Sequence, residues 1–295
     1  MTRSPATVCP ATAPRHPRRR RVTTPLPVGP FGLPPFALEP ITALRFRRRG
    51  FSIALDPTQA VQVLGRGHPP EVDVHLPFPS LQPRHVVLHR RPELPGHLYW
   101  ERVGGHCKVG TQRGFEFFPA LGVAPISRAD VLCLGDVEVM ALGKSAHALE
   151  GPVARRCGRD AYAVVDEVLA AAERFSPLVI EGATRDAHAL AELLHHGTQK
   201  RAHPFFVPGA LGRRAREIDA LLREADCGTV FVREQVLASA PAEFLAALLD
   251  RDDYHLWPIF VVDSERTFWQ RLDHLGVRGA PARTVRSVRV PHVVA

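Results

Sequence analysis

The stretch GRGHPPEVDVHLPFPSLQPRHVVL, residues 65–88, decides the first half of the fold. It holds two short apolar runs, Val72–Leu76 and His85–Leu88, separated by proline and serine turn signals. Similar runs recur on both sides, and no helical periodicity of ten residues interrupts them before residue 144. The other runs are Ala43–Phe46, Phe51–Leu55, Val61–Leu64, His97–Trp100, Phe115–Phe118 and Val137–Leu142. This spacing predicts an all-β domain over residues 41–143, a sandwich or a barrel.

The pattern changes near residue 159, where amphipathic helical stretches begin to alternate with short apolar strands. The expected helices are 160–175, 187–196, 213–225, 241–249 and 266–275, and the expected strands are 178–180, 204–207, 229–232, 257–262 and 285–290. Continuous apolar strands between such helices predict a mostly parallel sheet covered on both faces. We therefore expect an α/β domain over residues 159–295. The weakly patterned residues 144–158 are expected to be a linker.

Residues 1–40 have the composition of a disordered tail. Ten of the 28 prolines lie there, and no apolar periodicity is present. Residues 1–50 carry ten arginines and one acid, Glu39, whereas the whole chain has a net charge of +8. The remainder is thus nearly neutral, which argues against a nucleic-acid groove in the folded part. The run Arg18–Arg21 leaves weak nucleic-acid binding by the tail open, and a solubilising tail is the simpler alternative.

Several function classes are disfavoured by what the sequence lacks. No apolar run approaches the ~20 residues of a membrane span, and no secretory signal is indicated. The five cysteines are odd in number and form no C-x-x-C pair, so we expect a reducing, cytoplasmic compartment. The fifteen histidines show no spacing typical of a metal site. We expect no metal, no cofactor and no catalytic residue.

Several short motifs follow one another in a particular order along the all-β region. They are Gly65-Arg66, Asp73-Val74-His75-Leu76, the segment from Ser80 to His85, Leu132 and Gly135-Asp136. This order resembles the forkhead-associated (FHA) domain, with its G-R, D-[IV]-x-L, S-R-x-H and L-x-x-G-D pattern. The resemblance covers residues 41–143 and implies a β-sandwich whose loops bind phosphothreonine peptides.

The resemblance assigns the phosphopeptide-binding positions to Arg66, Gln82 and Arg84. Arg66 stands where the family places the arginine that can form a forked contact with two phosphate oxygens. Gln82 replaces the family's serine, and its longer stem moves the hydrogen-bond donor. Pro83 removes a backbone N–H, and the Gly104–Gly114 stretch lacks the family's asparagine. His85 is expected to be buried beneath the loop, and Gly135-Asp136 to form a turn.

The second half resembles a shortened AAA+ module of sigma-54 activators. The segments that carry the resemblance are 177–184, 190–195, 204–207, 227–234 and 285–291. The ATPase residues are missing from it. The phosphate loop reads Gly182-Ala183-Thr184 without its further glycines, and its lysine position falls on Ala187 or His188. Arg233 stands where the family has its metal-binding aspartate, so Glu234 lacks a metal partner.

These patterns indicate a non-enzymatic bacterial signalling protein. The FHA-like domain would bind a phosphothreonine or acidic segment of a partner protein. The degenerate AAA+-like domain would serve as a pseudo-ATPase interaction module, with an intact AAA+ relative as one candidate partner. The alternatives are a sigma-54-dependent transcriptional regulator with residual nucleotide binding, and a decaying paralogue without a selected activity.

Overall fold

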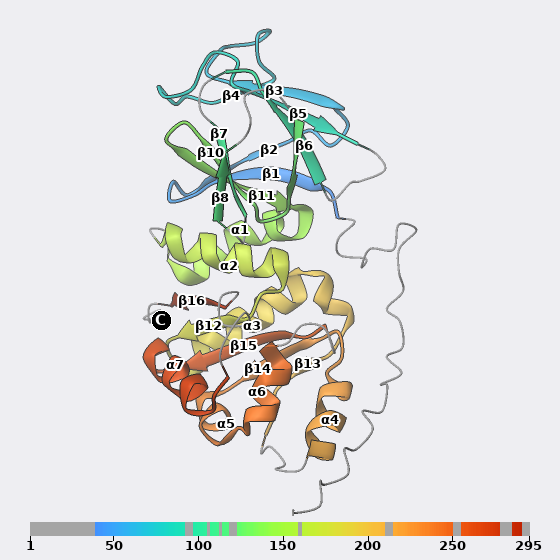
Figure 1. Cartoon of the computed structure of the whole chain (residues 1–295), viewed down its shortest axis with the longest axis vertical. Coiled ribbons are helices and arrows are strands. Elements are labelled where there is room, and N and C mark those ends of the chain that lie inside the picture. The colour runs from blue at the N-terminus through green and yellow to red at the C-terminus, as the bar shows by residue number, and fades with distance from the viewer. Residues whose placement is uncertain are drawn as a thin grey trace, which may run out of the picture.

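A computed structural model describes most of the chain after the arginine-rich N-terminal segment (Figure 1). The described residues are 39–91, 97–104, 107–111, 114–117, 123–158, 161–209, 215–249, 255–277 and 285–290. The predicted tail, residues 1–40, therefore lies almost entirely outside them. Glu39 is described, and its carboxylate accepts hydrogen bonds from Ser145 N (2.6 Å) and Arg128 Nη1 (3.1 Å). The anchored part of the chain thus begins no later than Glu39.

The first half of the described chain consists of eleven strands. They are β1 (Ile41–Phe46), β2 (Phe51–Ala54), β3 (Val61–Gly65), β4 (Val74–His75), β5 (Val86–Arg90), β6 (His97–Arg102), β7 (Cys107–Thr111), β8 (Gly114–Phe117), β9 (Val123–Ser127), β10 (Val131–Leu134) and β11 (Val137–Gly143). One sheet has the order β2-β1-β11-β10-β7-β8, and the other has the order β4-β3-β5-β6-β9. The predicted all-β sandwich is confirmed.

Side chains from both sheets fill the space between them. Phe46 of β1, Leu64 of β3 and Trp100 of β6 are among the buried residues of this core. Three strands, β7, β9 and β10, were not predicted. Strand β9 contains Pro125 and lies at the edge of its sheet, where a missing ladder N–H is tolerated.

Strands β1 and β11 are buried on both faces. Whereas Leu44 of β1 faces the sandwich core, Ala43, Met140 and Leu142 belong to a second core formed with helices. This explains the nearly unbroken apolar run of β11, which is typical of strands covered on both sides. The sheet of β1 and β11 therefore separates two cores.

Residues 144–157 form helix α1 (Lys144–Cys157), which corrects the expectation of a linker at 144–158. Ala146, Leu149, Val153 and Cys157 are its buried residues, and their spacing follows the helical period. Gly151 and Pro152 lie inside this helix, and both residue types disfavour helix interiors. Burial of the apolar stripe between the sheet and the next helices offsets that local cost.

The second half is an α/β domain with a parallel sheet, as predicted. Its strands are β12 (Leu178–Glu181), β13 (Phe205–Phe206), β14 (Thr229–Val232), β15 (Trp257–Val262) and β16 (Arg286–Arg289). Its helices are α2 (Tyr162–Arg174), α3 (Thr184–Gly197), α4 (Ala215–Glu224), α5 (Glu234–Ser239), α6 (Ala242–Leu249) and α7 (Glu265–His274), with a 3-10 turn at Gln199–Ala202. The sheet order is β13-β14-β15-β12-β16, and every pairing is parallel.

Helices cover both faces of this sheet. Helices α1, α2 and α3 share one core with one face, whereas α4 to α7 share another core with the opposite face. Figure 1 shows α2 between the sandwich and the parallel sheet. Because α3 leaves β12 on one face and α7 leaves β15 on the other, the crossovers reverse between these two neighbouring strands. In open α/β sheets, ligands bind at such a reversal, beyond the carboxyl ends of the strands.

A buried ion-pair network joins the sandwich to α1 and α2. Arg45 of β1 is only 1% exposed, and its guanidinium donates to Asp166 Oδ1 of α2 and to Glu150 Oε1 of α1, each at 2.6 Å. Asp166 Oδ2 also accepts from the backbone N of Arg48 at 2.7 Å. Loss of one partner of such a buried pair costs about 3–5 kcal/mol. The two halves of the described chain are therefore firmly connected.

Candidate functional site

The backbone at the end of β3 is held directly against the loop before β5. Arg66 N donates to Gln82 O, and Gly67 N donates to Pro83 O, both at 2.9 Å. A Cβ on Gly65 would lie 2.1 Å from Pro83 O, so only glycine permits this approach. The Gly65-Arg66 pair of the sequence pattern thus has a steric reason, and Pro83 contributes through its carbonyl oxygen.

Arg66 projects its side chain onto the same loop. Arg66 is exposed, and its Nη1 donates a hydrogen bond to Pro79 O at 3.3 Å. A guanidinium carries five N–H donors in a planar fork. One backbone contact orients that fork while the side chain stays open to solvent. This is the arrangement that an incoming anion needs.

Gln82 and Arg84 lie on the loop between β4 and β5, which accepts the backbone hydrogen bond from Arg66 N, and both residues are exposed. A Cβ on Gly104 would meet Gln82 Cγ at 3.1 Å and Arg84 O at 3.2 Å. The Gln82 stem therefore lies against the chain that leaves β6. The structure brings Arg66, Gln82 and Arg84 together on adjoining loops at one end of the sandwich, and their role in binding a phosphopeptide stays a prediction.

His85 supports this loop from inside, as predicted. It is fully buried, and its Nδ1 accepts a hydrogen bond from Gln82 N at 3.2 Å. Its own backbone N donates to Leu64 O of β3 at 2.9 Å, and its carbonyl oxygen accepts from Val103 N and Gly104 N. One residue therefore ties the candidate loop to β3 and to the end of β6.

Two carboxylates stabilise the neighbouring turns. Asp73 accepts from Val63 N at 2.7 Å through its side chain, and its own N donates to Val63 O at 2.9 Å. Asp136 accepts a hydrogen bond from the Ser80 hydroxyl, and Gly135 has a φ of 60°. The predicted turn at Gly135-Asp136 is confirmed. Ser80, which follows Pro79 in the chain, was not among the predicted site residues.

The carboxyl end of β12 is where the AAA+ resemblance places the degenerate phosphate loop. Only Gly182 and Ala183 separate β12 from α3, which begins at Thr184. Of the two lysine positions considered, Ala187 is fully buried, and the ring of His188 packs edge-on against Phe231 with centroids 5.0 Å apart. Ala187 therefore has no access to a ligand, and the His188 ring is held against the core on one side.

Carboxylates gather at this end of the parallel sheet. Glu234, after β14, accepts a hydrogen bond from Asp263 N at 3.2 Å. The pKa of the Glu234 carboxyl is raised, mainly by partial burial and also by the nearby Asp263 carboxylate. Glu181, at the end of β12, accepts from Glu265 N at 3.1 Å and pairs with Arg289. The hydrogen bond from Glu265 N, more than Arg289, lowers the pKa of Glu181. Arg233 occupies the N-cap position of α5 without a side-chain capping hydrogen bond, and it is exposed. This edge is therefore more acidic than a phosphate site should be.

Comparisons with known proteins return FHA domains among solved structures. No family model matches the chain, and no curated protein matches it. The FHA domain of CT664 from Chlamydia trachomatis is 18% identical and covers 34% of this chain and 95% of its own, with a TM-score of 0.27. Mycobacterium tuberculosis EmbR in complex with a low-affinity phosphopeptide is 15% identical and covers 35% of this chain and 24% of its own, with a TM-score of 0.28.

A third structure is the MEK1 FHA domain in complex with a phosphothreonine peptide of HOP1. It is 15% identical and covers 36% of this chain and 98% of its own, with a TM-score of 0.28. These matches span about a third of the chain, and the AAA+ resemblance of the α/β domain remains a prediction. Among the described residues, no helix is long and apolar enough to cross a bilayer.

Proposed function

We propose that the sandwich binds a phosphothreonine-containing segment of a partner protein at Arg66, Gln82 and Arg84. The observation that carries this proposal is the close contact of Gly65-Arg66 with the Gln82-Pro83 backbone, which holds the exposed Arg66 guanidinium on the loop that also carries the exposed Gln82 and Arg84. A phosphate dianion prefers forked, charge-assisted hydrogen bonds from arginine. The Gln82 amide can donate one more hydrogen bond from the adjoining loop.

The α/β domain would act as a nucleotide-inactive interaction module. Two features support this part of the proposal: the two-residue connection between β12 and α3, and the carboxylates where the crossovers reverse. A triphosphate is bound through backbone amides of a glycine-rich loop and a lysine, and this domain offers neither at that place. We therefore propose a non-enzymatic signalling protein. In it, the sandwich binds a phosphorylated segment of one protein, and the α/β domain contacts a further protein.

The phosphate-binding proposal is tested with a library of threonine peptides in phosphorylated and unphosphorylated forms, measured by fluorescence anisotropy. We expect binding of phosphorylated peptides only. Arg66→Ala should weaken it by about 10- to 150-fold, since a hydrogen bond to a charged group contributes about 1.5–3 kcal/mol. Arg66→Lys should recover only part of the affinity, because a point charge lacks the fork geometry.

Arg91→Ala is the matched control. Arg91 is exposed just after β5, at the end of that strand away from His85, and its guanidinium lies 4.3 Å from the Tyr99 ring centroid. This variant removes the same charge from the same domain, so an equal loss of affinity in both variants would indicate general charge attraction. Equal binding of both peptide forms would contradict the proposal.

A further inference from the structure

Strand β2 lies at one edge of the sandwich sheet that contains β1 and β11, and among the described strands only β1 pairs with it. Leu55 N donates to Thr42 O at 2.8 Å. Hydrogen-bonded residues alternate along an antiparallel strand, so Ile53 also bonds to β1, whereas Ser52 and Ala54 direct their backbone N–H and C=O groups away from it. An added strand can form hydrogen bonds with this outward row.

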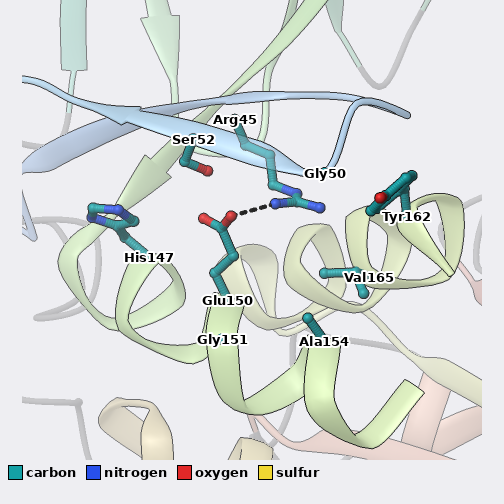
Figure 2. A pocket seen from close by; sticks show the side chains of 9 residues that line it. All are labelled: Arg45, Gly50, Ser52, His147, Glu150, Gly151, Ala154, Tyr162 and Val165. Atoms are coloured by element: carbon teal, nitrogen blue, oxygen red, sulfur yellow. Dashed lines mark hydrogen bonds and ion pairs between the residues drawn. The ribbon is translucent and has the colours of Figure 1, made fainter. Parts of the chain in front are cut away.

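Aromatic side chains lie exposed beside this edge. Phe51 of β2 is 38% exposed, and its ring stacks on Phe46 with centroids 4.7 Å apart. Tyr162 is 37% exposed and lies against the turn between β1 and β2, because a Cβ on Gly50 would be 2.2 Å from Tyr162 Cε1 (Figure 2). All other exposed large apolar residues in the described part of the chain are valines. Exposed aromatic side chains beside an unpaired strand edge are typical of a protein contact.

The side of β2 that faces the helices borders a pocket of about 540 Å³ (Figure 2). Arg45, Ser52 and Glu150 are among its lining residues. Arg45 pairs with Glu150 and with Asp166, so these charges already have partners within the chain. The edge of β2, rather than this pocket, is the surface that offers backbone groups to a binding partner.

Opposite charges lie at the two ends of β2. Arg48 and Arg49 precede the strand, Asp56 follows it, and all three are exposed. Asp56 accepts hydrogen bonds from the hydroxyl and the backbone N of Thr58, and these bonds lower the pKa of its carboxyl. An antiparallel copy of β2 would therefore bring the arginines of each chain beside the carboxylate of the other.

Backbone geometry restricts how two β2 strands can pair. Residues with outward N–H and C=O groups must lie opposite one another, and a twofold axis at Ser52 meets this condition. Phe51 of each copy then lies opposite Ile53 of the other, and Arg48 lies opposite Asp56. Aromatic and β-branched residues form a favourable cross-strand pair. In this arrangement the stretch is complementary to itself in backbone, apolar side chains and charge.

We infer that two copies of this chain associate through their β2 strands, in antiparallel orientation about a twofold axis. The two sheets would then form one continuous sheet across the interface. The match of both the apolar pair and the charges favours a second copy over a strand of another protein. The inference uses none of Arg66, Gln82 and Arg84, so it is independent of phosphopeptide binding.

Sedimentation velocity of the full chain, from micromolar to millimolar concentration, measures this association. We expect a concentration-dependent equilibrium of monomer and dimer that weakens as salt is added, because salt screens the exposed ion pairs. Ala54→Pro should abolish the dimer, since proline removes an outward N–H and leaves the bonds to β1 intact. Circular dichroism checks that this variant is folded. A wild-type chain that stays monomeric throughout would overturn the inference and leave the edge to a strand of another protein.

Phe51→Ser tests the side-chain contact. It should raise the Kd of the dimer about tenfold, because the cross-strand pair with Ile53 is lost twice. Val207→Ser is the matched control. Val207 is 37% exposed and follows β13 in the other domain, so the Kd should be unchanged. A dimer that persists in both Ala54→Pro and Phe51→Ser would place the contact elsewhere and refute the inference.

Charge reversal tests the orientation of the two strands. Arg48→Glu and Asp56→Arg should each weaken the dimer of the pure variant about tenfold, because like charges then meet at both ends of the interface. An equimolar mixture of the two variants should restore dimerisation, since each new glutamate meets a new arginine and the native pair re-forms at the other end. A mixture no tighter than either variant alone would contradict antiparallel pairing.

Discussion

Gly65 shows how a single residue can set the geometry of the candidate phosphate site. The strand β3 ends there, and the carbonyl oxygens of Pro83 and Gln82 would lie 2.1 Å and 2.9 Å from any Cβ. A larger residue must push the two loops apart and break the backbone bond from Arg66 N to Gln82 O. The glycine permits the close approach, and the arginine that follows makes use of it.

We predict that Gly65→Ala lowers the free energy of unfolding by about 1–3 kcal/mol, the usual range for forcing extra atoms into a packed site. Urea denaturation measures this change, and phosphopeptide affinity should fall with it because Arg66 is displaced. Gly151→Ala is a control with the opposite expected sign. Gly151 lies inside α1, and its Cβ would meet Arg155 Nη1 at an ordinary 3.5 Å, so alanine should stabilise by about 0.5–1 kcal/mol. A neutral Gly65→Ala would mean that the loop contact is loose.

At the scale of elements, α1 and the connection between β12 and α3 determine what the second half can do. Helix α1 forms in spite of Gly151 and Pro152 because its apolar stripe is buried against β1, β11, α2 and α3. The β12–α3 connection consists of Gly182 and Ala183, and Gly182 N donates to Val262 O at the end of β15. Ala187 of α3 is buried in the core, and the His188 ring packs edge-on against Phe231.

We predict that Mg·ATP at millimolar concentration causes no thermal shift and that no phosphate is released. A ligand at a hundredfold excess over its Kd would stabilise the native state by about 2.7 kcal/mol, which a thermal-shift assay detects readily. An ATPase with an intact phosphate loop, measured in the same buffer, serves as the positive control. A dose-dependent shift with this protein would mean that nucleotide binds without the usual loop, and the pseudo-ATPase proposal would have to be abandoned.

At the scale of the whole molecule, a layer of helices and ion pairs separates the sandwich sheet that contains β1 and β11 from the parallel sheet of the α/β domain. Glu173 of α2 is buried in this layer, where it accepts from Gly143 N of β11 and faces Arg128 and Glu39. Glu167 of α2 pairs with Arg47 of β1 and with Arg286 of β16. One helix thereby contacts the sandwich and the parallel sheet through charged side chains as well as through the shared core.

The pH dependence of stability should reflect Glu173. Burial raises the pKa of Glu173 to about 7, although Arg128 and the Gly143 N–H oppose the shift. The folded state then binds more protons than the unfolded state between the ordinary glutamate pKa and 7. The stabilisation from this group is therefore complete below the ordinary value and is lost as the pH rises through 7.

We predict that Glu173→Gln removes this part of the pH dependence. Urea denaturation at pH 5 and pH 8 should show the wild type losing on the order of 2–3 kcal/mol more than the variant over that interval. Burial lowers the pKa of His195 and of His203, and these groups change stability in the opposite direction. The difference between wild type and variant is therefore the informative quantity. Parallel profiles for the two proteins would show that Glu173 titrates normally.

The sequence by itself determined the two fold classes and most strands and helices, because local periodicity and turn chemistry are encoded within a few residues. The grouping of Arg66, Gln82, His85 and the Gly135-Asp136 turn was implied by the resemblance to the FHA domain. The sequence could not determine α1, the edge strand β9 or the pocket at Arg45. Each of these depends on contacts between residues far apart in the chain, such as Arg45 with Asp166 and Gly50 with Tyr162. Such long-range packing outweighs local propensity, and only the tertiary structure specifies it.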